Sequence, residues 1–446
     1  MNECVIGVDI GSSRIKALAF DASGGVAAHA AVETPRITRG GTVDFPVLAM
    51  IEAAAAVTRD VARAAPVVRG IGVTSMGEVG TILHNGALAD LAFPSWHDER
   101  GEDVVRDIAA LAAELDAHHR TGAHLRPVST VAKLGWLSRQ TEVPSGTFMV
   151  IASAFAWTLT GAPAQERSLA TTLGVVSPWD GEVLDRLWDA AGLGAYAIAP
   201  IHRTGMAHPV TPSAAQILDL PGGIPVVVAG HDHPVAAVGT GAPLDAVVDS
   251  LGTGEPLLAP LQDRPALDSR FPPPHMSVET SPATGGPLVI SEGLRPGLAM
   301  DALLRASGVD RSRLDAQLDV HAADVLTADA VAALEHGDVR MSADAQGWSQ
   351  LHAHLVGRAH AADAELRRVT GATGPTVLTG GGLRSRGWVS MKAQRASHPL
   401  LVSTATETAA RGAAAIVGVA AGWWDAPEAM PGATLVEASA WRGELG

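Results

Sequence analysis

The pattern of apolar and polar positions predicts mixed strands and helices along the chain. Apolar residues alternate at 4–34, where Gly-Ser-Ser and Ala-Ser-Gly-Gly interrupt three predicted strands. Helical spacing follows at 47–65, 101–120 and 129–140, and the apolar run VRGIGVTSM is a predicted buried strand. Strands and helices in this order are typical of an α/β fold.

The second half repeats part of this plan. GGIPVVVAGHDH (222–233) is predicted to be a buried strand with a polar end, and DAVVDSLGTGEPLLAP a hairpin around a Gly-Thr-Gly turn. The first hairpin, VDIGSSRIKALAF, has the same order of strand, glycine turn and returning strand, which indicates two similar halves. Because 446 residues exceed one hydrophobic core, we expect domains at 1–235 and 236–446.

Between and after these strands the pattern changes several times. Residues 262–290 are rich in proline and predicted to be irregular, whereas 349–370 form a long predicted helix that ends at Gly371. TVLTGGG is a predicted strand that runs into a triple-glycine turn, and TETAARGAAAIVGVAAG is a helix of small residues suited to close packing. His352 and His354 diverge on the long helix, so we expect them to be solvated.

Composition narrows the possible partners and location. The formal net charge of -15 argues against nucleic acid or an anionic membrane as a partner. Cys4 is the single cysteine, which excludes intrachain disulfides and thiolate zinc sites. Glu3 and Asp9 interrupt the first apolar run, and no stretch approaches the roughly 20 apolar residues of a membrane helix. We therefore expect a cytoplasmic protein; the sequence leaves a homodimer open.

The first turn has the chemistry of a phosphate site. A strand that ends at Asp9 is followed by Gly11, Ser12 and Ser13, which offer backbone N–H groups and hydroxyls to phosphate oxygens. Asp9 is positioned to meet hydrated Mg²⁺. Neither the Walker pattern nor the dinucleotide G-x-G-x-x-G motif occurs at this turn, so those folds lose support.

The strand VVVAG leads into Gly230-His231-Asp232-His233. A carboxylate at such a strand end is suited to act as the general base for a substrate hydroxyl, which makes Asp232 the candidate. The alternative is a metal site made by His231 and His233, for which the sequence shows no third ligand nearby. The glycines at 380–382 permit close approach of a ligand or of backbone, although many α/β turns look the same.

Five segments in this order resemble the FGGY family of carbohydrate kinases, within the actin-like ATPase superfamily. They are VIGVDIGSSRIKALAFD, TSMGEVGTILHNG with PSWHDERG, GHDHPVAAVG, DSLGTGEPLLA, and TGGGLRSRGWVSMKAQRASHPL with ETAARGAAAIVGVAAGWW. The resemblance implies two actin-like (ribonuclease H-like) α/β domains with a nucleotide cleft between them. It also implies an ATP- and Mg²⁺-dependent kinase acting on a hydroxyl of a sugar, ketose or polyol.

The resemblance assigns roles position by position. Asp232 would be the catalytic base, and Asp9 and Asp232 would face Mg²⁺, in part through water. The sugar or polyol would contact Gly77, Glu78, Trp96, Asp98, Arg100 and His233. The nucleotide and its phosphates would contact Gly11, Ser12, Ser13, Lys16, Gly252, Thr253, Gly254, Gly381, Gly382 and Ser385.

The chain also departs from the family pattern. Residues 310–348 lack the Gly-Glu-Arg-x-Pro run that precedes the last long helix in the family. The contact triplet is Met-Gly-Glu, where glycerol kinases have Gln-Arg-Glu and xylulose kinases Gln-Met-His, and the aspartate motif is GHDH. These departures leave the substrate open. Two other hypotheses are an actin-like ATPase and a sugar-responsive regulator without phosphoryl transfer, but neither requires both Asp232 and the Trp96-x-Asp98-x-Arg100 segment.

Overall fold

The computed structural model describes residues 3–96, 98–262 and 271–443, which form two compact units. The described residues of unit 1 are 3–239, 271–287 and 407–432, and those of unit 2 are 240–262, 288–406 and 433–443. The chain first leaves unit 1 after Gly239, four residues beyond the boundary expected from the sequence. It then returns to unit 1 twice, so the units do not follow a single division of the chain.

Unit 1 is built around one mixed sheet. In sheet order its strands are β14 (Ala207–Pro209), β15 (Pro225–His231), β6 (Val67–Ser75), β1 (Glu3–Ile10), β2 (Arg14–Asp21) and β3 (Val26–Glu33). The pairs β1–β6 and β6–β15 are parallel, whereas β1–β2 and β2–β3 form the antiparallel meander predicted at 4–34. Parallel strands bring the carboxyl ends of β1, β6 and β15 to the same edge of the sheet.

Smaller sheets and helices complete unit 1. The small sheets contain β12 (Tyr196–Ile198), β10 (Gly146–Val150), β7 (Gly80–His84) and β8 (Ala87–Leu88); β4 (Ile37–Arg39), β5 (Thr42–Pro46) and β9 (Ala92–Pro94); and β11 (Gln165–Glu166) with β13 (Ile201–His202). The helices are α1 (Val47–Ala64), α2 (Glu102–Glu114), α3 (Ala117–Thr121), α4 (Thr130–Gln140), α5 (Ile151–Thr160), α6 (Arg167–Thr171), α7 (Asp185–Ala190), α8 (Pro212–Leu218), α9 (Asp232–Gly239) and α15 (Thr408–Ala420). β18 (Met276–Thr280) and the short η2 (Pro427–Ala429) also belong to this unit.

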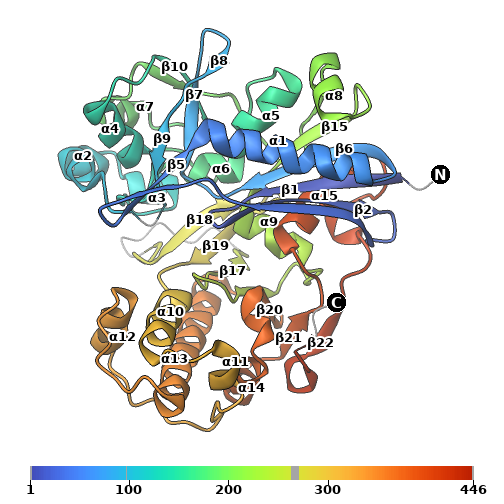
Figure 1. Cartoon of the computed structure of the whole chain (residues 1–446). Helices are drawn as coiled ribbons and strands as arrows, with labels where there is room; N and C mark the ends of the chain where they lie inside the picture. Colours follow the sequence, from blue (N-terminus) through green and yellow to red (C-terminus); the bar gives the residue numbers. More distant parts are fainter. Residues whose placement is uncertain (1–2, 97, 263–270, 444–446) are drawn as a thin grey trace. The chain divides into compact units, whose positions relative to one another are not determined.

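Helices cover both faces of the central sheet because successive residues of a strand point to opposite faces. On one face, Ile6 and Val8 of β1 are buried in the same cluster as Met50 of α1. On the other, Val5 is buried with Ala410 of α15. Figure 1 shows α1 and α15 on opposite sides of β1. The apolar spacing at 47–65 therefore predicted the helix correctly, together with its buried stripe.

The small-residue helix α15 lies unusually close to the sheet. A Cβ atom on Gly7 of β1 would overlap the carbonyl oxygen of Ala410, and one on Gly72 of β6 would overlap that of Ala413. Glycine at these positions lets the helix backbone rest directly on the strands. The expectation of close packing for the TETAARG segment is confirmed, and its partner is the amino-terminal sheet.

Unit 2 contains a second mixed sheet. In sheet order its strands are β19 (Pro287–Ser291), β17 (Leu257–Pro260), β16 (Val247–Ser250), β20 (Thr376–Thr379), β21 (Leu400–Ser403) and β22 (Leu435–Glu437). Its helices are α10 (Pro296–Ser307), α11 (Arg311–Asp315), α12 (Ala328–Glu335), α13 (Ala345–Thr370) and α14 (Arg386–Arg395), with the short η1 (Gly381–Arg384) and η3 (Ala438–Ala440). The predicted second hairpin is the antiparallel pair β16–β17.

Three local expectations were wrong. Residues 262–290 are not irregular throughout, since β18 and the start of β19 lie there. The helix expected at 101–120 is divided into α2 and α3, because Asp116 has a left-handed backbone with φ of 52°. His352 and His354 are buried on α13, where their Nδ1 atoms contact the carbonyl oxygen of Trp348 and the carboxylate of Asp324.

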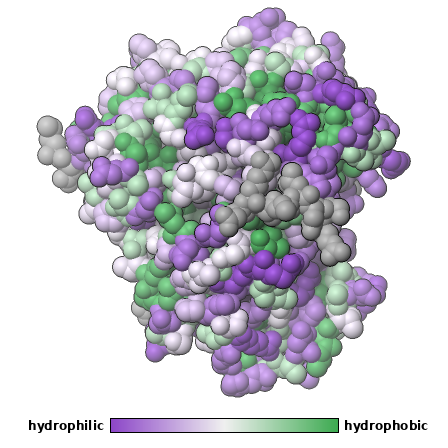
Figure 2. Space-filling model, turned by 180° about the vertical axis from the view of Figure 1, so that it is seen from behind, coloured by the Kyte–Doolittle hydropathy of each residue, from purple (hydrophilic) through white to green (hydrophobic). Residues whose placement is uncertain are grey.

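Among the described residues no helix is long and apolar enough to cross a membrane. Hydrophilic side chains cover much of the face shown in Figure 2, with smaller apolar areas between them.

Candidate active site

Two carboxylates stand at the carboxyl edge of the unit 1 sheet. Asp9 on β1 and Gly230 on β15 both pair with Thr74 of the central strand β6. The Thr74 hydroxyl donates a 2.7 Å hydrogen bond to the carbonyl oxygen of Gly230, which holds the end of β15 beside β6. β15 ends at His231, and Asp232 is the first residue of α9. Strand pairing thus brings Asp9 and Asp232 to the same edge.

The pair has the electrostatics of a cation site. Oδ1 of Asp9 and Oδ1 of Asp232 are buried and accept no hydrogen bond from any described residue. Burial, and secondly the negative charge of Asp232, raise the pKa of Asp9 to about 7, although Lys16 opposes the shift. Two mutually repelling carboxylates whose Oδ1 atoms lack hydrogen bonds are suited to bind a hard divalent cation such as Mg²⁺, which takes oxygen ligands and retains water.

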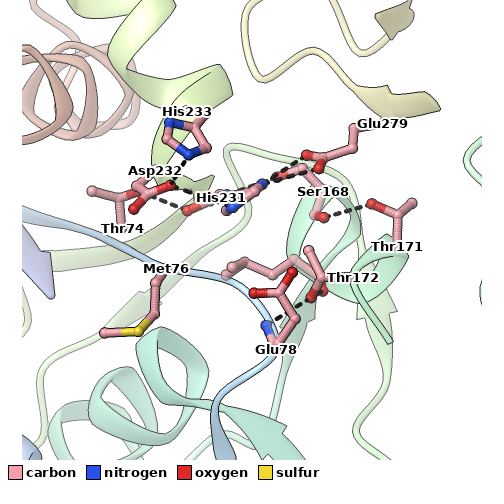
Figure 3. A network of polar contacts seen from close by, with 12 residues as sticks. Thr74, Met76, Glu78, Ser168, Thr171, Thr172, His231, Asp232, His233 and Glu279 are labelled. Atoms are coloured by element: carbon pink, nitrogen blue, oxygen red, sulfur yellow. Dashed lines mark hydrogen bonds and ion pairs between the residues drawn. The ribbon is translucent and has the colours of Figure 1, made fainter. Parts of the chain in front are cut away.

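A buried histidine stands behind Asp232. Nδ1 of His231 lies 2.9 Å from Oε2 of Glu279 on β18, and its Nε2 lies 3.3 Å from Oδ1 of Asp232 (Figure 3). Burial alone would lower the pKa of His231, but the charge and hydrogen bond of Glu279, followed by the charge of Asp232, raise it to about 10. The backbone N–H of His231 also donates to Oγ of Ser168 at 2.9 Å. His231 is therefore a fixed positive charge beside the candidate base at neutral pH.

His233 belongs to the first turn of α9 and is more exposed, with Nε2 3.9 Å from Oδ1 of Asp232. The strand ends at His231 and His233 lies in α9, so the two histidines do not lie on one face of a strand. Ligand atoms of His231, Asp232 and His233 nevertheless lie within 4.8 Å of one another. Asp232 therefore supplies the third ligand that the sequence did not reveal for the alternative metal site.

Gly77 and Glu78 follow β6 in a strained turn. A Cβ atom on Gly77 would lie 2.6 Å from Cγ2 of Thr172, so Thr172 fills the space that a side chain would need. Glu78 has φ of 54°, and its backbone N–H donates to the Thr172 hydroxyl at 3.1 Å. Strained backbone is concentrated at functional sites. In Figure 3 the Glu78 carboxylate lies on the same side of its turn as His231, whose pKa it also helps to raise.

The segment that contains Trp96, Asp98 and Arg100 is held by internal ion pairs. Arg100 Nε donates to Oδ2 of Asp98 at 2.8 Å, and Nη2 lies 2.7 Å from Asp44. Burial raises the pKa of Asp98, but the hydrogen bonds from Arg100 outweigh it and leave the pKa lowered. Trp96 is half-buried against the unit 1 core. Arg100 is thus committed to two carboxylates of its own chain.

Lys133 of α4 holds the same segment in place. This lysine was not among the site residues predicted from the sequence. Its side chain is fully buried, and Nζ donates to the carbonyl oxygens of Ser95 at 2.6 Å and Asp98 at 2.8 Å. Burial lowers the pKa of Lys133 to about 8, against the opposing charges of Asp98 and Glu78. Glu279 was also missed, because its strand lies in the proline-rich segment. For Lys133, the one available signal in the sequence was the presence of a lysine within an otherwise apolar helical stretch.

The turn between β1 and β2 is the first candidate phosphate loop. The Gly11 N–H donates to the carbonyl oxygen of Arg14 at 3.2 Å, while Ser12 is half-buried and Ser13 exposed. Lys16 points to Glu407, with Nζ 2.5 Å from Oε2, at the start of α15. The turn residues therefore lie beside Asp9, and the Lys16 ammonium is already paired.

Unit 2 carries the second candidate phosphate turn between β16 and β17. The Gly252 N–H donates to the carbonyl oxygen of Gly254 at 3.1 Å, and the Gly297 N–H donates to that of Thr253 at 3.1 Å. A Cβ atom on Gly297 would lie 2.5 Å from Cα of Thr253, so α10 begins in close contact with the turn.

The segment predicted to border the adenosine lines a cavity within unit 2. η1 contains Gly381 and Gly382, and Ser385 caps α14 by accepting a hydrogen bond from the Trp388 N–H. Gly381 and Ser385 line a cavity of about 620 Å³, whereas Gly382 is buried against Leu251 and Trp388. The remaining lining residues are Asp310, Arg311, Ser312, Asp315, Ala316, Arg384, Arg386 and Gly387. Five of these residues, from Asp310 to Ala316, lie at the start of the segment 310–348 that lacks the family run, and they form one wall.

Comparison with known proteins assigns the family. Residues 4–239, more than half of the chain, match the model of the N-terminal domain of the FGGY family of carbohydrate kinases. This chain belongs to that family. An L-fuculokinase of Salmonella typhi is 26% identical over 267 residues, which are 57% of this chain and 56% of that kinase. The matched region thus spans little more than half of the length of this curated kinase.

Solved structures agree on the fold. A xylulose kinase of Lactobacillus acidophilus superposes with a TM-score of 0.81 at 15% identity, covering 98% of this chain and 93% of the other. A gluconate kinase of the same organism gives 0.80 at 16% identity, covering 98% and 93%. The expected α/β fold with two actin-like domains and mixed sheets is confirmed by these likenesses.

Proposed function

We propose that the protein is a cytoplasmic, ATP-dependent kinase that transfers the γ-phosphate to a hydroxyl of a small sugar, ketose or polyol. The observation that carries this proposal is the carboxylate pair of Asp9 and Asp232, whose buried Oδ1 atoms accept no hydrogen bond from the described residues, at one sheet edge of an FGGY-family chain. Glu78 and His231 stand near the same edge, where a hydroxylated substrate would need hydrogen-bonding partners.

Asp232 would accept the proton of the substrate hydroxyl as the oxygen attacks the γ-phosphate. Its Oδ1 atom is buried and lies 3.3 Å from Nε2 of His231, so the other carboxylate oxygen would take this proton. His231, fixed by Glu279, would hold the carboxylate in place from behind. His233, on the more exposed side, would contact the substrate.

The two glycine turns would bind the phosphates through backbone N–H groups, at Gly11–Ser13 in unit 1 and at Gly252–Gly254 in unit 2. Asp9 and Asp232 would hold Mg²⁺, in part through water, in keeping with the hydrogen bonds that their Oδ1 atoms lack. The cation would offset negative charge that develops on the transferred phosphoryl group. The cavity bordered by Gly381 and Ser385 would receive the nucleoside.

The charges near Asp232 favour an uncharged substrate. Three carboxylates, those of Glu279, Asp232 and Glu78, raise the pKa of His231, and Lys133, whose charge also acts on Glu78, is fully buried. Arg100, the cation that could have paired with a sugar acid, is occupied by Asp98 and Asp44. Carboxylates accept hydrogen bonds from hydroxyls and repel anionic groups. We therefore propose an open-chain polyol or ketose in preference to an aldonic acid or a sugar phosphate.

A coupled ADP-release assay with ketoses, polyols, sugar acids and sugar phosphates tests this function. With the best acceptor, Asp232→Asn should reduce kcat by about 10²–10⁴-fold while nucleotide binding is retained, because an amide cannot take the proton. Asp185→Asn is the matched control, since Asp185 is also the first residue of a helix but is exposed. Turnover of Asp232→Asn within threefold of the wild type would remove Asp232 from this role.

The panel also tests the substrate class. An aldonate as the best acceptor by a wide margin would contradict the proposed preference and leave the kinase assignment intact. ATP hydrolysis that no member of the panel stimulates would instead favour an actin-like ATPase or a regulator.

A further inference from the structure

Unit 2 contains a buried group of three charges that the proposed mechanism does not use. Lys392 of α14 has a side chain only 2% exposed, and its Nζ lies 2.6 Å from Oδ2 of Asp249 and 2.5 Å from Oε1 of Glu255. Both carboxylates are equally buried. We refer to Asp249, Glu255 and Lys392 as the buried triad.

The two carboxylates of the triad flank the second glycine turn. Asp249 lies on β16 before Gly252-Thr253-Gly254, and Glu255 follows this turn directly. The single ammonium group of Lys392 therefore joins the strand that enters the turn to the residue that leaves it. The backbone supports the same residue, since the Glu255 N–H donates to the carbonyl oxygen of Leu294 at 2.9 Å.

Lys392 also connects this turn to the candidate nucleoside cavity. It lies on α14, whose cap residue Ser385 borders that cavity, and α14 begins immediately after η1. The triad thus links the two segments of unit 2 that we assign to the phosphates and to the nucleoside. A displacement of either segment would be transmitted through the ion pairs to the other.

The free-energy cost of burying the triad indicates that it does more than stabilise the fold. Removing three charges from water is costly, and well-packed apolar residues in their place are often no less stable. Two buried carboxylates share one ammonium, so the group favours a proton on one carboxylate over an excess of negative charge. Burial, opposed by Lys392 and reinforced by Asp249, raises the pKa of Glu255 to about 8. An arrangement with this cost is expected where it fixes one geometry among several.

We propose that Lys392 is a positioning residue that holds the Gly252–Gly254 turn, through Asp249 and Glu255, in the conformation that receives the nucleotide phosphates. This inference rests on the proposed function insofar as the turn binds phosphate. Lys392 itself touches neither nucleotide nor substrate in this role; it acts through the two carboxylates.

The decisive variant removes all three charges together. Lys392→Met alone would leave two buried carboxylates facing each other and is expected to fold poorly. The uncharged triple variant Asp249→Asn, Glu255→Gln, Lys392→Met avoids this repulsion and should unfold within a few degrees of the wild type. If the triad positions the turn, the triple variant should bind ATP at least tenfold more weakly in calorimetry, with the KM for the acceptor unchanged.

Arg395→Met is the matched control. Arg395 is on the same helix and also donates to buried backbone, the carbonyl oxygens of Ala353 and Ala322, but it does not reach the turn. This variant should bind ATP as the wild type does. A folded triple variant with ATP affinity within twofold of the wild type would overturn the proposal.

Hydrogen exchange of the nucleotide-free protein separates this proposal from the kinase assignment. In the triple variant the backbone N–H groups of Gly252 and Glu255 should exchange at least tenfold faster than in the wild type, because the turn is no longer held. Unchanged exchange would overturn the positioning role whatever the protein catalyses. Wild-type protein that binds no ATP would overturn the proposed kinase function and the nucleotide part of this proposal.

Discussion

Lys133 offers the sharpest test of how the candidate sugar segment is held. Its buried ammonium group donates to the carbonyl oxygens of Ser95 and Asp98, on either side of Trp96. Lys133→Met keeps a similar length and apolar stem but removes both donors. We expect the segment to lose its fixed conformation, and the KM for the acceptor to rise at least tenfold with the KM for ATP within twofold.

The effect on stability should be much smaller than two lost hydrogen bonds would suggest. Hydrogen bonds to a charged group contribute about 1.5–3 kcal/mol each, so the two together contribute roughly 3–6 kcal/mol. Against this, burial lowers the pKa of Lys133 from 10.5 to about 8, which corresponds to a cost of about 3 kcal/mol at neutral pH. The variant should therefore lose only about 0–3 kcal/mol of unfolding free energy.

The lowered pKa of Lys133 also predicts how the contribution of this residue to stability changes with pH. Between pH 8 and 10.5 the unfolded chain binds more protons at Lys133 than the folded protein, so the contribution of this residue to stability rises with pH in that window. The difference in unfolding temperature between wild type and Lys133→Met should therefore widen from pH 7 to pH 10.

The assay is ADP release with the best acceptor, together with thermal unfolding at both pH values. Arg139→Met is the control, because Arg139 is on the same helix but is exposed and pairs with Asp103 and Asp107. An acceptor KM within twofold of the wild type in folded Lys133→Met would refute the anchoring role. A stability loss well above 3 kcal/mol would refute the charge-cost argument.

Two further predictions concern unit 1 as a folded body. Burial, and secondly the charge of Asp21, raise the pKa of Cys4 to about 11. A disulfide reagent at pH 8 should therefore label Cys4 about 100-fold more slowly in the folded protein than in denaturant, and the rate for the folded protein should increase as pH rises. Equal rates in the folded and denatured protein would contradict this prediction. A Cβ atom on Gly412 would overlap the carbonyl oxygen of Val235, so Gly412→Ala should lower stability by about 1–3 kcal/mol in thermal unfolding, whereas Ala420→Ser, exposed on the same helix, should have little effect.

Local patterns predicted the parts of this fold that depend on near neighbours. The alternation around Asp9 fixed the meander and its turn, because hairpin strands pair with adjacent sequence. Gly371 ended α13 as expected, since a left-handed cap is a local requirement. The motif order also identified the family, because its glycines and aspartates recur at fixed places along the chain.

The rest depended on contacts between distant segments, which no local pattern contains. Glu279 meets His231 only because β18 joins unit 1, and its proline-rich surroundings concealed the strand. His352 was expected to be solvated from its spacing, but packing on both sides of α13 buried it. Lys392 gave no sign of its role, since its two partners lie about 140 residues away in the sequence.

The position of α15 has a consequence for how the protein is made. β1 emerges from the ribosome long before α15, so the face that carries Gly7 and Gly72 remains uncovered until residues 408–420 have been synthesised. Unit 1 therefore cannot complete its fold during translation of its own amino-terminal 239 residues. A nascent chain that stalls before residue 408 would present an uncovered apolar sheet face to chaperones and proteases, so the survival of residues 3–239 depends on the synthesis of the distant segment 408–420.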